Sequence, residues 1–147
     1  MPYYIAQSEE DRPGEGKNND ESINKSFQKA HQLALRNKAK LVLLALGMKD
    51  FDFTDLNSAL KNPAYNLAAD FASNEPFKNE TVKVSRSLEM PKAVSDDTVY
   101  WVLFPSLPEI KSLTELCNDT VHVVVTEGAP FGRLDEWSKD NNAQKVV

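Results

Sequence analysis

Five charged side chains occur in the loops where a ligand would be expected to bind. They are Lys17, Asp50, Asp52, Glu127 and Arg133, and each lies in or at the end of a loop that follows a predicted strand. In open α/β sheets, ligands bind beyond the carboxyl ends of the strands, where these loops begin. Charges of both signs in one pocket suit a polar small molecule or a metal-assisted reaction. We therefore predict these five as ligand-binding residues, and we assign no catalytic residue, no metal ligand and no cofactor.

The loop before the first predicted helix contains glycines and a lysine near a helix start. Such a segment can hold a phosphate group through its backbone N–H groups. Residues 14–18 read Gly-Glu-Gly-Lys-Asn, which lacks the Walker spacing, and Asn18 stands where a serine or threonine would coordinate magnesium. Several carboxylates in the same loop would repel an anion. These residues indicate an acidic solvated loop rather than a phosphate site.

The loop at residues 50–54 reads Asp-Phe-Asp-Phe-Thr and follows an apolar strand. Over these five residues it resembles the nucleophile motif of haloacid-dehalogenase-type phosphatases. The resemblance implies a nucleophilic first aspartate and an acid/base second aspartate, both screened by magnesium. Two residues separate Asp50 from the glycine that ends the strand, and the acidic pair at 96–97 precedes a strand instead of following one. The resemblance ends with this loop, and its aspartates also suit the cap of the following helix.

The cysteine and the two histidines do not form a recognisable site. One cysteine and two distant histidines cannot supply a structural zinc tetrahedron. A nucleophilic pair of Cys117 and His122 would need a thiolate with a low pKa and an orienting partner. Both residues are predicted at the amino end of the last strand or within it, away from the expected ligand edge. Cys117 is more simply interpreted as a small buried hydrophobic side chain.

Hydrophobic periodicity predicts strands that alternate with helices. The strands are expected at 3–6, 41–46, 81–88, 98–104 and 120–126, and the helices at 22–37, 55–60, 63–72, 107–116 and 133–141. This order predicts one small three-layer α/β/α domain, residues 1–147, with a mostly parallel, mixed sheet of about five strands. We expect 81–88 to pair antiparallel with the next strand or to lie at an edge. We expect the tail at 142–147 to be frayed.

The net charge of -5 is concentrated in one segment. Residues 9–21 hold six acidic and two basic residues, a net charge of -4, so the rest of the chain is close to neutral. The loop at 8–21 is therefore interpreted as solvated, mobile or a binding place for a positive group. The densest basic group indicates a solvated helix face more than a contact patch. That group comprises Lys25, Lys29, Arg36, Lys38 and Lys40.

Composition excludes several classes of protein. With 41% hydrophobic and 27% charged residues, the chain is expected to fold rather than to be disordered. No apolar run approaches the roughly 18–20 residues of a membrane-spanning helix. An acidic balance argues against nucleic acid as a partner. A lone cysteine and the lack of a visible secretory signal predict a reducing, cytoplasmic location without a membrane partner.

The lack of a complete catalytic constellation favours a non-catalytic binding or protein-interaction module. Aromatic residues in loops and chain ends add the expectation of a protein partner or of self-association as a homo-oligomer. These aromatic residues are Tyr3, Tyr4, Phe51, Phe53, Phe131 and Trp137. The alternative hypothesis is a small-molecule or metal-dependent enzyme, or a ligand sensor, that uses the loops at the carboxyl ends of the strands.

Overall fold

The computed structural model describes residues 3–7, 17–46, 60, 77–78, 81–82, 84–128 and 132–146 of the chain. For 17–19, 77–78 and 81–82 it describes the backbone alone. The predicted helix at 63–72, and that at 55–60 apart from Leu60, lie outside the described residues.

The described residues form a six-stranded sheet in which every strand pair is parallel. The strand order is β5-β2-β6-β7-β1-β8. The strands are β1 (Tyr3–Ala6), β2 (Lys40–Leu44), β5 (Val84–Ser87), β6 (Thr98–Leu103), β7 (His122–Thr126) and β8 (Gln144–Val146). A separate antiparallel pair joins β3 (Phe77–Lys78) to β4 (Thr81–Val82). The prediction of a small α/β domain with a mostly parallel sheet is confirmed.

The two edge strands differ in detail from the sequence-based expectation. β5 lies at an edge, as one of the two alternatives predicted, but its partner is β2 and the pairing is parallel. The opposite edge is β8, which is formed by the tail that was expected to be frayed. The sequence Gln-Lys-Val carries no strand pattern of its own, so the long-range pairing with β1 determines this strand. The sheet therefore has six strands instead of about five.

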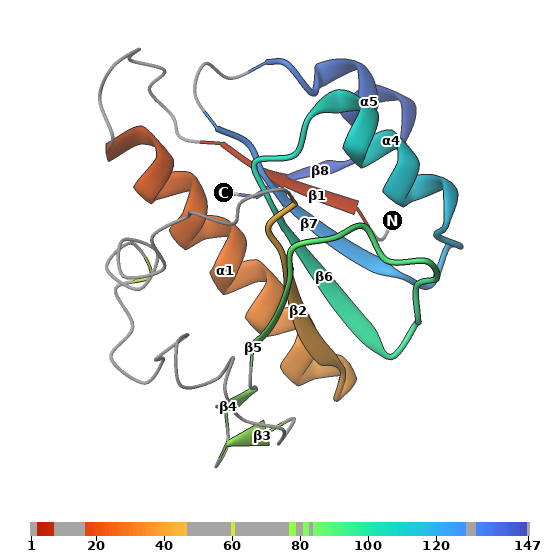
Figure 1. The fold of residues 1–147 in the computed structure, drawn as a ribbon. Helices are drawn as coiled ribbons and strands as arrows, with labels where there is room; N and C mark the ends of the chain where they lie inside the picture. Colours follow the sequence, from red (N-terminus) through yellow and green to blue (C-terminus); the bar gives the residue numbers. More distant parts are fainter. Residues whose placement is uncertain are drawn as a thin grey trace.

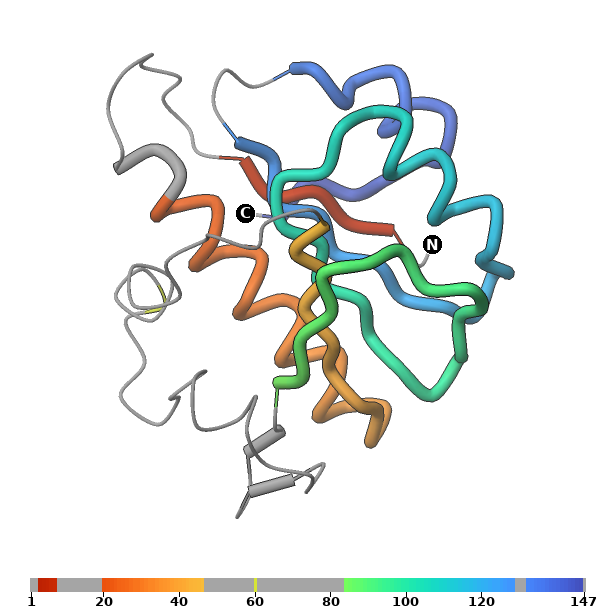
Figure 2. The backbone as a smooth tube through the Cα atoms, viewed as in Figure 1, coloured from red at the N-terminus to blue at the C-terminus, as the bar shows by residue number. Residues whose placement is uncertain are grey.

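Helices cover both faces of the sheet, which gives the three layers of the domain. Helix α1 (Lys17–Asn37) lies on one face, and α4 (Leu107–Glu115) and α5 (Asp135–Asp140) lie on the other, as Figures 1 and 2 show. α1 begins at Lys17, so the last part of the predicted acidic loop is helical, and Asp20 in its first turn suits the helix dipole. No helix in the described part of the chain combines the length and apolar composition needed to cross a bilayer.

The central strand β6 supplies side chains to two hydrophobic cores. Val99, Trp101 and Leu103 join the core under α1, whereas Tyr100 and Val102 join the core under α4 and α5. All six residues of this strand are buried. Successive side chains of a strand point to opposite faces, so a strand between two helical layers must be apolar throughout. This requirement explains the unbroken apolar sequence of β6.

A single described helix, α1, lies across the face that it covers. It packs over β6 and β7, near the middle of the sheet. Strands lie about 4.8 Å apart and a helix with its side chains is about 10–12 Å wide, so one helix covers about two or three strands. The edge strand β8 therefore lies beside α1 rather than beneath it. This arrangement leaves room for a groove along one side of the helix.

Candidate functional site

Glu127 is the predicted site residue whose contacts the structure defines most fully. It follows β7 and its side chain is 2% exposed. Its Oε1 accepts hydrogen bonds from the backbone N–H groups of Gly132 and Arg133, and its Oε2 accepts one from Gln7 Nε2 at 2.9 Å. Its own N–H donates to the carbonyl of Ala6 at 3.1 Å. Glu127 therefore joins the carboxyl ends of β1 and β7 and anchors the start of the last helical segment.

The other predicted site residues are placed only in part. Arg133 is exposed and meets Glu127 through its backbone N–H, not through its guanidinium group. Lys17 is the first residue of α1, and its side chain lies outside the description. Asp50 and Asp52 also lie outside the described residues. The structure thus brings together two of the five predicted residues, and the contact between them orders the backbone.

A buried hydroxyl cluster, which the sequence did not single out, connects α1 to the sheet. Ser26 Oγ and Thr126 Oγ1 lie 2.5 Å apart, and Trp101 Nε1 donates to both oxygens at 2.9 Å. All three side chains are fully buried, and Ser26 Oγ also donates to the carbonyl of Ile23. None of the recorded partners of the two hydroxyls is the general base that a serine or threonine nucleophile requires. The cluster is therefore a structural link between helix and sheet.

Cys117 and His122 do not form a nucleophilic pair. His122 is in register with Val99 on the face of the sheet that α1 covers, whereas Cys117 packs with the core on the opposite face. Burial lowers the pKa of His122, and the nearby positive charge of Lys29 lowers it further. Burial raises the pKa of Cys117 from 9.0 to about 11, with a hydrogen bond to Tyr3 acting in the opposite direction. The thiol is therefore protonated at neutral pH and donates to the carbonyl of Leu113 at 3.3 Å.

We expect Cys117 to react slowly with a thiol reagent such as a disulfide dye. At pH 8, a pKa of about 11 leaves roughly one thiol in a thousand as the reactive thiolate. Because the folded pKa exceeds the unfolded one, the contribution of this thiol to stability is present below pH 9 and is lost between about pH 9 and 11. Stopped-flow labelling of native and denatured protein measures the difference. Equal rates at pH 8 would contradict the burial of the thiol.

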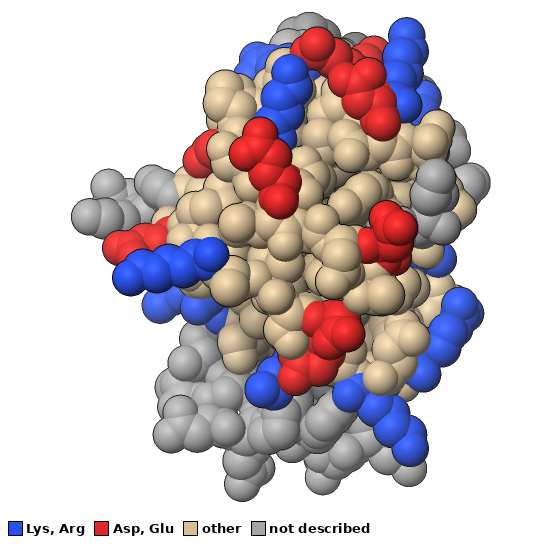
Figure 3. Space-filling view, turned by 90° about the vertical axis from the view of Figure 1, so that its right-hand side faces the viewer, with Lys and Arg blue, Asp and Glu red and all other residues tan. Residues whose placement is uncertain are grey.

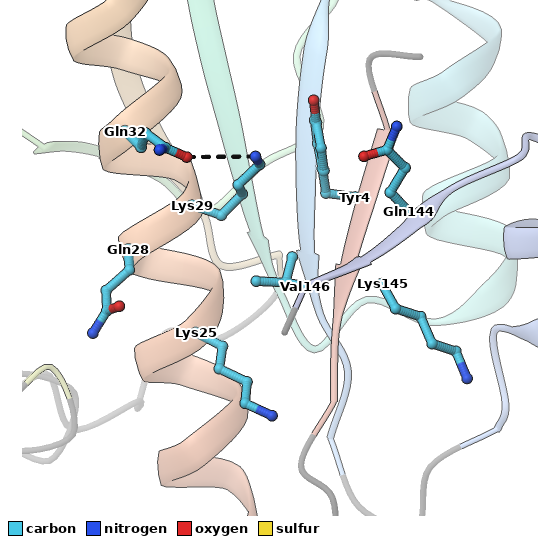
Figure 4. Close-up of a pocket in the computed structure, with 8 residues that line it drawn as sticks. All are labelled: Tyr4, Lys25, Gln28, Lys29, Gln32, Gln144, Lys145 and Val146. Atoms are coloured by element: carbon cyan, nitrogen blue, oxygen red, sulfur yellow. Dashed lines mark hydrogen bonds between the residues drawn. The ribbon is translucent and has the colours of Figure 1, made fainter.

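The structure places a groove of about 420 Å³ between α1 and β8. Tyr4 of β1 lies between these two elements, as the close-up in Figure 4 shows. The residues that line the groove are Tyr4, Lys25, Gln28, Lys29, Gln32, Gln144, Lys145 and Val146. We call this set the basic groove, because it contains three lysines and no acidic residue. Its volume is within the roughly 300–1,000 Å³ typical of ligand sites.

Two regular spacings build the basic groove. Lys25, Lys29 and Gln32 recur at four and three residues, which places them on one side of α1. Across the groove, Gln144 is in register with Tyr4, so both side chains face the α1 layer, and Val146 follows two residues later. Lys145 belongs to the alternate side of β8 and extends away from α1 (Figure 4). Of the three lysines, only those of the helix therefore extend from α1 toward the sheet across the groove.

These two helix lysines have different partners. Lys25 Nζ lies 3.0 Å from Glu21 Oε1 and donates to the backbone carbonyl of Gln7 at 3.3 Å. Lys29 Nζ lies 4.6 Å from the centre of the Tyr4 ring and donates to Gln32 Oε1 at 3.4 Å. Among the described residues, no carboxylate lies within ion-pair distance of Lys29. Lys29 thus brings a half-buried positive charge to the groove that no described acidic side chain neutralises.

The charged side chains of the basic groove are distributed differently from those on another side of the molecule. On the side shown in Figure 3, acidic and basic side chains are mixed around a broad uncharged area. Among the described residues on that side, charges of one sign do not gather in this way. The basic groove is therefore a local feature of the surface of an acidic protein, which has a net charge of -5.

The sequence pointed to only half of the basic groove. Lys25 and Lys29 belong to the basic group that was interpreted as a solvated helix face, and their helical spacing is visible in the sequence. The opposite wall comes from residues more than a hundred positions away.

Within the described part of the chain, no group of three or more histidine, cysteine or acidic residues could hold a metal ion. Comparison of the chain with protein-family models, curated proteins and solved structures finds no match.

Proposed function

We propose that this chain is a non-catalytic binding module whose basic groove holds an anionic ligand. The observation that carries the proposal is that Lys29 lies in a concave polar groove and has no carboxylate partner among the described residues. Ammonium and amide groups donate hydrogen bonds to anions, and bonds to charged groups are the stronger ones. A negatively charged group is thus the ligand chemistry that best fits this lining.

The same lining supports binding rather than catalysis. It contains no carboxylate, histidine or thiol among its described residues. Those side chains serve most often as general bases and as activated nucleophiles. Its three glutamines have amide groups that neither gain nor lose protons near neutral pH. The titratable groups of the lining are lysines and a tyrosine, and the ammonium groups carry the positive charge that attracts an anion.

We expect the small carboxylate anion citrate to bind saturably. Its affinity should fall about tenfold when Lys29→Glu reverses one charge. The matched control is Lys92→Glu, which makes the same charge change at an exposed residue. Lys92 lies between Met90 and Val94, which pack on the α4 and α5 side of the sheet, away from the groove.

Nuclear magnetic resonance titration detects weak binding and reports where it occurs. Binding is expected to perturb the signals of α1 and β8, to be unchanged within about twofold in Lys92→Glu, and to weaken as salt is added. Absence of saturable perturbation in the unmodified protein would overturn the proposal. Equal losses in the two variants would also overturn it, because net charge rather than the groove would then determine binding.

A further inference from the structure

We propose that the basic groove takes an extended acidic segment of a partner protein, with carboxylates on alternate residues facing Lys25 and Lys29. This inference rests on the proposed function, because it names the ligand of the same site. It is carried by three observations: the spacing of the lysines, the amide groups of the lining, and the contacts that Lys25 already makes.

The spacing of the two lysines matches the repeat of an extended chain. Lys25 and Lys29 are four residues apart on α1, which corresponds to about 6 Å along the helix axis. In an extended peptide, side chains on the same face are two residues apart and about 6.6 Å from each other. The Lys25 ammonium group points toward Glu21 and that of Lys29 toward Gln32, so carboxylates at alternate positions would meet both lysines once these long side chains turn toward the peptide. Adjacent acidic residues would point to opposite sides, and one of them would turn away from the helix.

The glutamines of the groove favour a peptide over a free anion. Gln28, Gln32 and Gln144 each carry an amide that both donates and accepts hydrogen bonds. Gln32 Oε1 already accepts a hydrogen bond from Lys29, and an anion without a donor group could not pair with the other amide oxygens. Peptide backbone groups present one donor and one acceptor at each residue, which matches the amides. Between α1 and Gln144 of β8, Tyr4 and Val146 supply apolar surface for the side chain between two acidic residues.

Lys25 already contacts both kinds of group that an acidic peptide contains. Its ammonium group lies 3.0 Å from the carboxylate of Glu21 and donates to the backbone carbonyl of Gln7 at 3.3 Å. The Lys25 side chain is 19% exposed, so most of this side chain is already enclosed by the protein. A carboxylate of an incoming peptide would compete with Glu21 for this cation. Removing the charge of Glu21 should therefore favour the peptide.

The test compares two peptides of identical composition, one with glutamates at alternate positions and one with the glutamates adjacent. We expect the alternating peptide to bind the full chain at least about fivefold more tightly. Lys29→Glu is expected to raise its dissociation constant about tenfold, and Glu21→Gln to lower it about threefold. Lys92→Glu serves again as the matched control and should leave binding unchanged. Fluorescence anisotropy of labelled peptides gives the constants, and circular dichroism confirms that each variant is folded.

The outcomes separate this inference from the proposed function. Saturable binding of citrate without tighter binding of the alternating peptide would leave the anion site standing and overturn the peptide ligand. Equal affinity for the two peptides would overturn the alternate spacing. Failure of both citrate and peptide to bind would overturn both proposals. Concentration-dependent self-association that Lys29→Glu abolishes would identify a second copy of this chain as the occupant and overturn a separate partner.

Discussion

Replacing Trp101 by phenylalanine is expected to lower the free energy of unfolding by about 3 kcal/mol. The indole is fully buried, and its N–H donates to Ser26 Oγ and Thr126 Oγ1. A phenyl ring leaves a small cavity and removes that donor from two buried hydroxyl oxygens. The first effect is a loss of packing, and the second leaves acceptors that water cannot reach.

Trp137 provides the matched control for the packing loss. It is 1% exposed, and its Nε1 has no hydrogen-bond partner among the described residues. Trp137→Phe therefore removes a similar volume but no hydrogen bond, and loss of an unpaired buried donor is not itself destabilising. We expect this variant to lose about 1–2 kcal/mol, so that the two variants differ by about 1–2 kcal/mol.

Chemical denaturation followed by far-ultraviolet circular dichroism measures both losses, with the slope of the transition held common to the variants. A larger loss for Trp101→Phe assigns the difference to the hydroxyl cluster. Equal losses would contradict the view that this cluster stabilises the contact between α1 and the sheet. A larger loss for Trp137→Phe would place the more important packing under α5.

The central strands of the fold could be predicted because their burial is recorded locally in the sequence. The apolar run at 41–46 and the run at 98–104 have no polar alternation, and both become interior strands, β2 and β6. β8 could not be predicted in this way, because Gln144 and Lys145 are polar and exposed. Only its pairing with β1 makes this segment a strand, and such long-range pairing leaves no mark on the local pattern.

The candidate site also has one part that the sequence predicts and one part that depends on long-range strand pairing. The helical spacing of Lys25 and Lys29 is visible in the sequence, but the facing wall at Gln144 and Val146 depends on the position of β8. For Glu127 the ligand-binding role stays a prediction, and its hydrogen bonds add a structural role. A charged residue after a strand was predicted to face a ligand, whereas its oxygens accept hydrogen bonds from the protein itself. Residue type and loop position do not distinguish these roles, since the difference lies in where the neighbouring backbone N–H groups point.

The hydrogen bonds of Glu127 also predict a large loss of stability for Glu127→Ala. The variant should lose about 3 kcal/mol or more of unfolding free energy. Alanine leaves the backbone N–H groups of Gly132 and Arg133 and the amide of Gln7 without their acceptor. Hydrogen bonds to a charged group contribute about 1.5–3 kcal/mol each, and these three bonds are partly buried, so unpaired donors add a further penalty. The losses share one side chain, so they are not expected to add fully.

Two further variants give this prediction its controls. Glu127→Gln keeps one acceptor oxygen for the two backbone N–H groups. We expect its loss of stability to be about half that of Glu127→Ala or smaller. Glu136→Ala removes a glutamate whose side chain is 61% exposed and pairs with Lys111 at the surface, and it should cost less than about 1 kcal/mol. Thermal and chemical denaturation of the three variants rank the losses.

The decisive comparison is between stability and ligand binding. If Glu127 orders the backbone, Glu127→Gln should bind citrate and the alternating peptide as the unmodified protein does, because the basic groove excludes this residue. Glu127→Ala with unchanged stability would contradict the structural role derived from its hydrogen bonds. A stable Glu127→Gln variant that loses binding of either probe would instead return Glu127 to the ligand-binding role that its position after β7 predicts, and would move the binding site to the carboxyl ends of the strands.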